Sequence, residues 1–272
     1  MFPKILTVGD IIYVKVTAKN ITQEPINYDR YSYTLGNDNF IMGVLLDKSG
    51  STGFGSGNSD RIELLSPFPI GTPTPGYPPK ETLQTGNTLV SGPQAVFVPP
   101  PSHYERQFWA WDDSTNEKRT LFSFNNSLSN VDRDANSKIL STSSHHVTVF
   151  QELVIKSRPN EELQLIKEWH EKAGFERGLR YDNTTPAEQW REFEGKLTPG
   201  TLRNYTRMIR TLVEIAQDEN QGKRQELFNE MLKWIDELPP LEKEGLTKKA
   251  YDIVKSQRHN TNFWDEITIP QE

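Results

Sequence analysis

Two short runs in this sequence have residue types that could bind a metal ion. Residues 132–136 (DRDAN) place side-chain oxygens at the first, third and fifth positions, as calcium-binding loops do. The Gly and the Glu that such loops carry further along are missing, so we expect a polar turn. His145 and His146 are adjacent, and adjacent residues of a strand point to opposite faces, which suits a shared metal poorly. We therefore expect no metal site.

A pair of tryptophans could instead bind a ligand by stacking. Trp109 and Trp111 are two positions apart, so they share one face of an expected strand. Exposed, the pair could form an aromatic platform for a sugar together with Tyr104; buried, it would belong to the core. We favour the core and keep a contact surface as the alternative.

Three arginines form a basic stripe on the longest expected helix. Arg203, Arg207 and Arg210 follow i, i+4, i+7 spacing opposite its apolar face. The surrounding residues 197–205 (LTPGTLRNY) resemble the helical core-binding domain of tyrosine recombinases, which would imply DNA contact. No Arg/His/Tyr catalytic domain follows, and the net charge of −6 supplies no basic excess for phosphate groups. We expect a solvated or subunit-facing surface and no nucleic acid.

The sequence has no recognisable catalytic motif. It has no Gly-rich phosphate loop, nucleophile elbow or HExxH sequence. It also has no cysteine, which excludes disulfides, zinc-thiolate sites and cysteine nucleophiles. The paired acids Glu161 and Glu162 lie in the first turn of an expected helix, where the helix dipole explains them. We expect a non-enzymatic protein without catalytic, cofactor-binding or metal-binding residues.

The elements that carry these residues change in kind at about residue 157. Before it, short alternating apolar runs are separated by Gly, Pro, Ser and Asn, which indicates strands and turns. After it, capped segments with a 3.6-residue apolar period indicate helices. This order predicts an α+β protein with a β domain at 1–157 and a helical domain at 158–272. We expect the latter to be a four- to five-helix bundle that folds by itself, with helices starting at Asn160, Thr185, Thr198, Gly222 and Thr247.

Two segments of the β half carry a resemblance to a known fold family. Residues 14–20 (VKVTAKN) and 92–99 (GPQAVFVP) resemble the opening hairpin and the closing strand of Ig-like domains in bacterial surface lipoproteins. The resemblance covers about residues 10–125 and implies an antiparallel β-sandwich. The sequence departs from that family because it lacks a lipobox cysteine and carries a long insertion at 47–101.

The insertion is unusually rich in proline and glycine. Ten prolines lie within residues 67–101, which predicts an extended arm that cannot form the interior of a sheet. We expect the arm to pack on a neighbouring subunit through its apolar residues Phe68, Ile70 and Tyr77.

These features together predict a structural subunit of a large assembly. We expect a phage or virus virion component, such as a capsid decoration, neck or tail protein, that contacts copies of itself or other virion proteins. The apolar run at residues 5–8 is too short for a signal peptide or a membrane span, so no membrane partner is expected. The alternative is an Ig-like module of the bacterial cell surface or extracellular space that binds a glycan or a protein.

Overall fold

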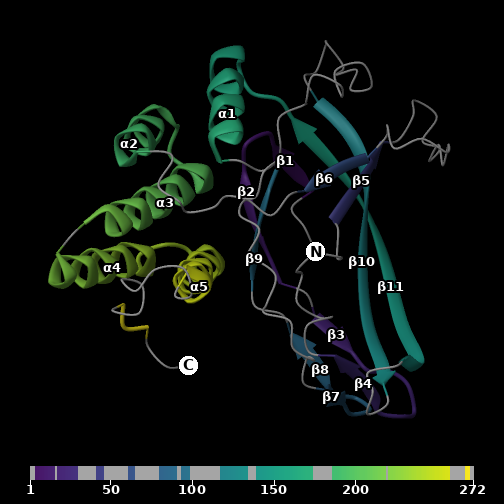
Figure 1. Cartoon of the computed structure of the whole chain (residues 1–272). Coiled ribbons are helices and arrows are strands. Elements are labelled where there is room, and N and C mark those ends of the chain that lie inside the picture. The colour runs from purple at the N-terminus through teal and green to yellow at the C-terminus, as the bar shows by residue number, and fades with distance from the viewer. Residues whose placement is uncertain are drawn as a thin grey trace.

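The computed structural model of the protein describes eleven strands followed by five helices (Figure 1). The described residues are 4–15, 17–29, 41–45, 61–64, 80–90, 93–98, 117–133, 139–173, 186–218, 220–257 and 267–269. The strands are β1 (Ile5–Thr7), β2 (Ile11–Val14), β3 (Thr17–Lys19), β4 (Ile26–Asp29), β5 (Ile41–Leu45), β6 (Arg61–Leu64), β7 (Lys80–Leu83), β8 (Thr88–Val90), β9 (Gln94–Phe97), β10 (Glu117–Arg133) and β11 (Ile139–Lys156).

Six of these strands form a long antiparallel ribbon, which we call the N-terminal ribbon. It consists of the successive pairs β2–β9, β3–β8 and β4–β7, which follow one another in Figure 1. Asn20 holds the bend between the second and third pairs: its amide donates to the carbonyls of Glu24 and Leu83, at 2.9 Å each. The pairing brings residues 11–29 against residues 80–97, with registers Ile11↔Phe97, Thr17↔Val90 and Ile26↔Leu83.

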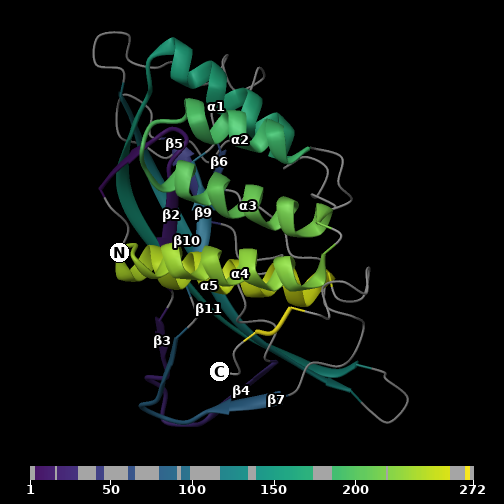
Figure 2. The ribbon, with the colours of Figure 1, turned by 90° about the vertical axis from the view of Figure 1, so that its left-hand side faces the viewer.

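The other strands form a five-stranded sheet in the order β1-β11-β10-β5-β6. β10 and β11 are its two long strands and pair with each other from Glu117↔Lys156 to Arg133↔Ile139, with a register shift after Asp132. β5 covers β10 only between Thr120 and Phe124, and β1 pairs with only the last three residues of β11. The remainder, residues 125–133 and 139–148, is a two-stranded extension that we call the hairpin arm. Figure 2 shows it reaching past the helices, on the side of β4 and β7.

The helices stack into a layer that covers the β2–β9 part of the N-terminal ribbon. α3 contacts α2, α4 and α5, and both α3 and α5 contact β2 (Figures 1 and 2). The helices are α1 (Asn160–Ala173), α2 (Ala187–Lys196), α3 (Thr201–Gln217), α4 (Gln221–Asp236) and α5 (Pro240–Gln257). Among the described residues, none of them combines the length and the apolar character that crossing a membrane requires.

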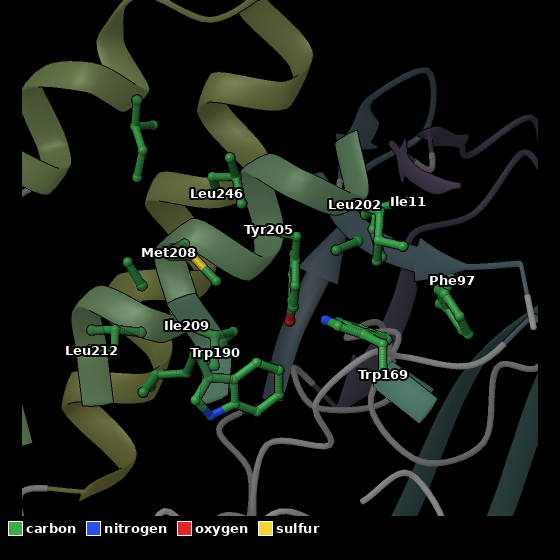
Figure 3. Close-up of a cluster of buried hydrophobic side chains, with 14 of the residues drawn as sticks. Ile11, Phe97, Trp169, Trp190, Leu202, Tyr205, Met208, Ile209, Leu212 and Leu246 are labelled. Atoms are coloured by element: carbon green, nitrogen blue, oxygen red, sulfur yellow. The ribbon is translucent and has the colours of Figure 1, made fainter. Parts of the chain in front are cut away.

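The main hydrophobic core lies between this helical layer and the strands. Trp169 of α1 is completely buried, with ring centroids 5.2 Å from Phe97 of β9, 6.4 Å from Trp190 of α2 and 6.5 Å from Tyr205 of α3. Figure 3 shows Ile11 of β2 in the same cluster as these aromatic rings. Strand and helix residues therefore share one core.

The predicted fold class is wrong. The described strands do not form two sheets packed face to face, so there is no Ig-like sandwich in this part of the chain. The strands of the N-terminal ribbon pair with partners far along the chain, from Asp29↔Lys80 to Ile11↔Phe97, and the β2–β9 pair packs against helices. Alternating sequence indicates strands but does not specify their partners, and this is why the sandwich was expected.

The predicted insertion at 47–101 is also corrected. The strands β7, β8 and β9, which lie between residues 80 and 97, belong to the N-terminal ribbon, and Phe97 and Val98 are completely buried in the core. The prolines of this segment lie next to β7, β8 and β9 and not within them, so they do not interrupt the hydrogen bonds between the strands. Residues 65–79 lie outside the described part of the chain.

Candidate functional site

The hairpin arm has long open edges. Among the described strands, none pairs with the outer edge of β10 or of β11 over the arm residues. Natural sheets usually protect such edges with lysine, proline or short strands. The described arm residues include no proline and no lysine, and their only charged pair, Asp132 and Arg133, lies at the tip. β4 contacts β10 without pairing with it, so over the arm residues the main-chain groups of these edges have no ladder partner among the described strands.

The residues predicted as contacts of the Pro-rich segment and of the tryptophan pair are not placed by the structure. Phe68, Ile70, Tyr77, Trp109 and Trp111 all lie outside the described residues. They stay predictions.

The three arginines predicted as a basic stripe lie on α3. The Arg207 guanidinium stacks on Trp234 of α4, 4.4 Å from the ring centroid. Arg210 donates from Nε to Glu194 of α2 at 2.6 Å and from Nη1 to Glu214 at 2.7 Å. These contacts connect α3 to its neighbouring helices, so Arg207 and Arg210 already have partners within the chain. Arg203 is half-buried on the same helix. A role of the stripe in an interface stays a prediction.

A pocket of about 110 Å³ lies where the β1–β2 corner meets α1 and the start of α3. Arg158 lines it and donates to the Val8 carbonyl at 2.6 Å, to Asp10 at 2.8 Å and to Glu162 at 3.1 Å. Burial raises the pKa of the Asp10 carboxyl, and the Arg158 charge offsets only part of this effect. The pocket has room for a few water molecules, and its ion pairs tie the strands to α1.

A second group, which we call the α5 cluster, lies where β2 meets α5 and comprises Tyr13, Glu242 and Gly245. Glu242 is 8% exposed and accepts a hydrogen bond of 2.9 Å from Asn204 of α3. The Tyr13 ring lies directly on Gly245, where an added Cβ would be 2.1 Å from the ring carbon Cδ1. The Tyr13 hydroxyl is buried, and no hydrogen-bond partner for it is found within the described structure.

Lys249, further along α5, is an unexpected buried lysine. It is 7% exposed, and desolvation lowers the pKa of its ammonium group to about 7. Burial of Tyr13, with the nearby Glu242 carboxylate, raises the pKa of the Tyr13 hydroxyl well above its ordinary value. The sequence could have predicted the burial of Glu242 and Lys249. Together with the apolar residues Leu246 and Ile253 they follow i, i+4, i+7, i+11 spacing, which places all four on one face of a helix.

No group of three or more His, Asp or Glu residues in the described ranges could hold a metal ion. His145 and His146 lie on β11, in register with Leu128 and Ser127 of β10. Residues 134–136 lie outside the described structure, so the expectation that residues 132–136 form a polar turn and not a calcium site stays a prediction.

Comparison with known proteins gives no match: no protein-family model, no curated protein and no solved structure is similar to this chain.

Proposed function

We propose that this protein is a non-enzymatic structural subunit of a large assembly, acting through protein–protein contacts. We further propose that the assembly is a phage or related virion, in which the chain serves as a capsid decoration, neck or tail protein. Its partners would be copies of itself or other virion proteins.

The hairpin arm is the observation that supports this proposal. A two-stranded ribbon in water is only marginally stable by itself, and open edges bind further strands through main-chain hydrogen bonds. The arm extends for eight paired positions beyond Phe124, from Asn125↔Thr148 to Asp132↔Ser141. An arm of this length gains stability when a neighbouring subunit covers it.

A virion is the assembly that suits these features best. In a symmetric particle, each arm meets the same surface of the next subunit, so one open edge is covered at every repeat. The Pro-rich segment with Phe68, Ile70 and Tyr77 would supply a second contact of the same kind.

The alternative of a cell-surface binding module loses its main support. That hypothesis depended on an Ig-like sandwich, which the described structure does not have. Its proposed glycan platform, Trp109 with Trp111, lies outside the described residues.

The experiment trims the arm and measures assembly. In the trimmed variant, an Asn-Gly turn replaces residues 126–147 and connects Asn125 to Thr148, so β10 keeps its pairing with β5. In analytical ultracentrifugation, we expect the full chain to sediment as a multi-subunit species and the trimmed variant as a monomer. Circular dichroism should show unchanged helix content.

Point variants test the edge itself. Ser127→Lys with Ser143→Lys adds two charges to the arm and should also prevent assembly, because lysine protects strand edges. The matched control, Gln189→Lys with Gln217→Lys, adds the same charge at exposed helical positions and should assemble normally. A full chain that stays monomeric, and is also absent from large particles in cells that carry its gene, would contradict the proposal.

A further inference from the structure

A short segment near the C-terminus packs against the helical layer. Residues 267–269, which we call the C-terminal segment, are neither helical nor part of a sheet, and Figures 1 and 2 show them beside α4. Ile267 is 1% exposed and belongs to the main hydrophobic core, and Ile269 is partly buried against the same core. Thr268, between them, is exposed. The segment therefore contributes two apolar side chains to a core built by elements far from it in sequence.

The place that receives this segment lies on α4. The main-chain N–H of Thr268 donates to Oε1 of Gln225 at 2.8 Å. Phe228 lies one turn further along α4, on the same face as Gln225, and is completely buried in the cluster that contains Ile267. The Phe228 ring is 6.2 Å from the ring of Tyr251 in α5. We call this place the α4 site, defined by Gln225 and Phe228.

The contacts of the C-terminal segment are those of a bound peptide. Alternate residues of an extended chain point to opposite sides, which agrees with two inward isoleucines on either side of an outward threonine. The main chain supplies a hydrogen bond to Gln225, and the isoleucines supply the apolar contact. The ligand that suits the α4 site is an extended peptide with branched apolar residues at alternate positions.

We expect docking of so short a segment to be reversible. Burial of one isoleucine and part of another is favourable by an amount similar to the conformational entropy that ordering a short extended segment costs. The hydrogen bond to Gln225 is exposed to solvent, so water competes for both partners and its net contribution is small. The α4 site is therefore open to another segment of the same kind whenever the chain's own segment leaves it.

We propose that the α4 site is a peptide-binding site, and that the C-terminal segment of a second copy of the chain enters it in place of the chain's own segment. A second copy carries the identical residues and makes the same contacts, and exchange of an identical element is a low-cost route to oligomers. The inference deepens the proposed function, on which it rests for its biological role, by naming one contact between copies. Its tests detect occupation of the α4 site, so they can fail while assembly through the hairpin arm succeeds, and the reverse.

Binding of a free peptide tests the site itself. The probe is a fluorescein-labelled peptide of residues 263–272, and fluorescence anisotropy measures its binding to the full chain. Ile267→Ser in the chain weakens the resident segment, so this variant should bind the peptide at least about 10-fold more tightly than the unaltered chain, in which the tethered segment competes. The control variant Thr268→Ser changes an exposed side chain and should behave as the unaltered chain does.

A second peptide makes this binding test specific. The same peptide with Ile267→Ser should bind none of these chains, because it lacks the side chain that the site buries. Equal binding of the two peptides by the Ile267→Ser chain, or no binding of either, would overturn the proposal. Circular dichroism should show that this chain keeps its helix content, and Ile267→Ala is the milder replacement if it does not.

Cross-linking tests exchange between whole chains. The sequence has no cysteine, so only introduced cysteines react with a short bis-maleimide. Chains with Gln225→Cys, mixed with chains with Thr268→Cys, should form covalent dimers whose yield rises with protein concentration. The control pair uses Gln189→Cys, at an exposed position of α2, in place of Gln225→Cys and should give only background dimers.

A positive control shows that the two cysteines are within reach of each other. A single chain with both Gln225→Cys and Thr268→Cys should cross-link within itself, because the two residues are in contact. If this chain cross-links internally while the mixed chains give no more dimers than the Gln189→Cys control, the segment stays in its own site, and the proposed exchange is wrong.

Discussion

Gly9 connects β1 to β2 at a point where the chain has no space for a side chain. Its φ of +89° is a conformation that favours glycine, and a Cβ there would be 2.5 Å from the Cδ1 atom of Ile166 in α1. Gly86 has a similar φ of +79° but nothing within 4 Å of an added Cβ. A side chain at Gly86 would meet only backbone strain, whereas a side chain at Gly9 would meet both backbone strain and a clash with Ile166.

We expect Gly9→Ala to destabilise the protein more than Gly86→Ala. The backbone term, about 1–2 kcal/mol, applies to both variants. Gly9→Ala adds overpacking of the buried Ile166, which costs about another 1–3 kcal/mol. Urea denaturation measures the difference. Adding Ile166→Val, which removes the Cδ1 atom, should recover part of the loss in Gly9→Ala; equal losses in the two glycine variants would show that packing is not limiting.

At the scale of elements, ion pairs connect α2 to α3. Arg210 of α3 binds Glu194 of α2 and Glu214 of its own helix, and all three side chains are less than one-fifth exposed. Arg191 of α2 binds Glu214 from the other side at 2.5 Å. Partly buried networks of this kind hold neighbouring helices in one arrangement.

Arg210→Met should therefore weaken the α2–α3 contact. It leaves two poorly hydrated carboxylates without their main partner, which costs about 1–3 kcal/mol in the free energy of unfolding. The control Lys196→Met breaks an exposed pair with Glu192 and should change stability little. Thermal melts at neutral pH compare the two variants. Equal losses of stability would show that the Arg210 ion pairs contribute no more than an exposed ion pair does.

The long hairpin shows a limit of element prediction. The alternating pattern predicts strands at 118–124 and 146–155, whereas β10 and β11 extend to Arg133 and back to Ile139. The added residues are mostly Asn, Ser and Thr. The backbone forms the ladder hydrogen bonds, so polar residues can continue a strand without any apolar alternation.

At the scale of the whole molecule, one core joins strands and helices. Leu6 and Phe97 from the strands are buried in the same cluster as Trp169 and Tyr205 from the helices. The division into two domains at residue 157 stays a prediction. The sequence predicts that the isolated helical segment folds by itself, whereas the shared core predicts that it needs the strands.

We expect residues 158–272, expressed alone, to contain helix but to melt without cooperativity. Without the strands, Trp169 and the α5 face lose their cover, and short helices in water are marginal. Circular dichroism and tryptophan fluorescence measure this, with the full chain as the control. A cooperative melt of the fragment would instead establish an independent helical domain.

The sequence by itself determined the positions of most helices. Asn160 is the first residue of α1, and the predicted starts near Thr185 and Thr198 lie within three residues of α2 and α3. This works because helical hydrogen bonds and caps are local, so a few adjacent residues are enough. The last helix is the exception: it was expected to start at Thr247, whereas α5 begins at Pro240, because proline suits the first helical position.

Only the tertiary structure decided the strand partners, the place of the core and the burial of Lys249. β2 could have paired with any strand of compatible pattern, and its pairing with β9 depends on contacts more than eighty residues apart along the chain. A buried lysine has the same sequence signature as a solvated one. Such features arise from packing between distant segments, because the free energy of burial depends on what covers a residue and not on its neighbours in sequence.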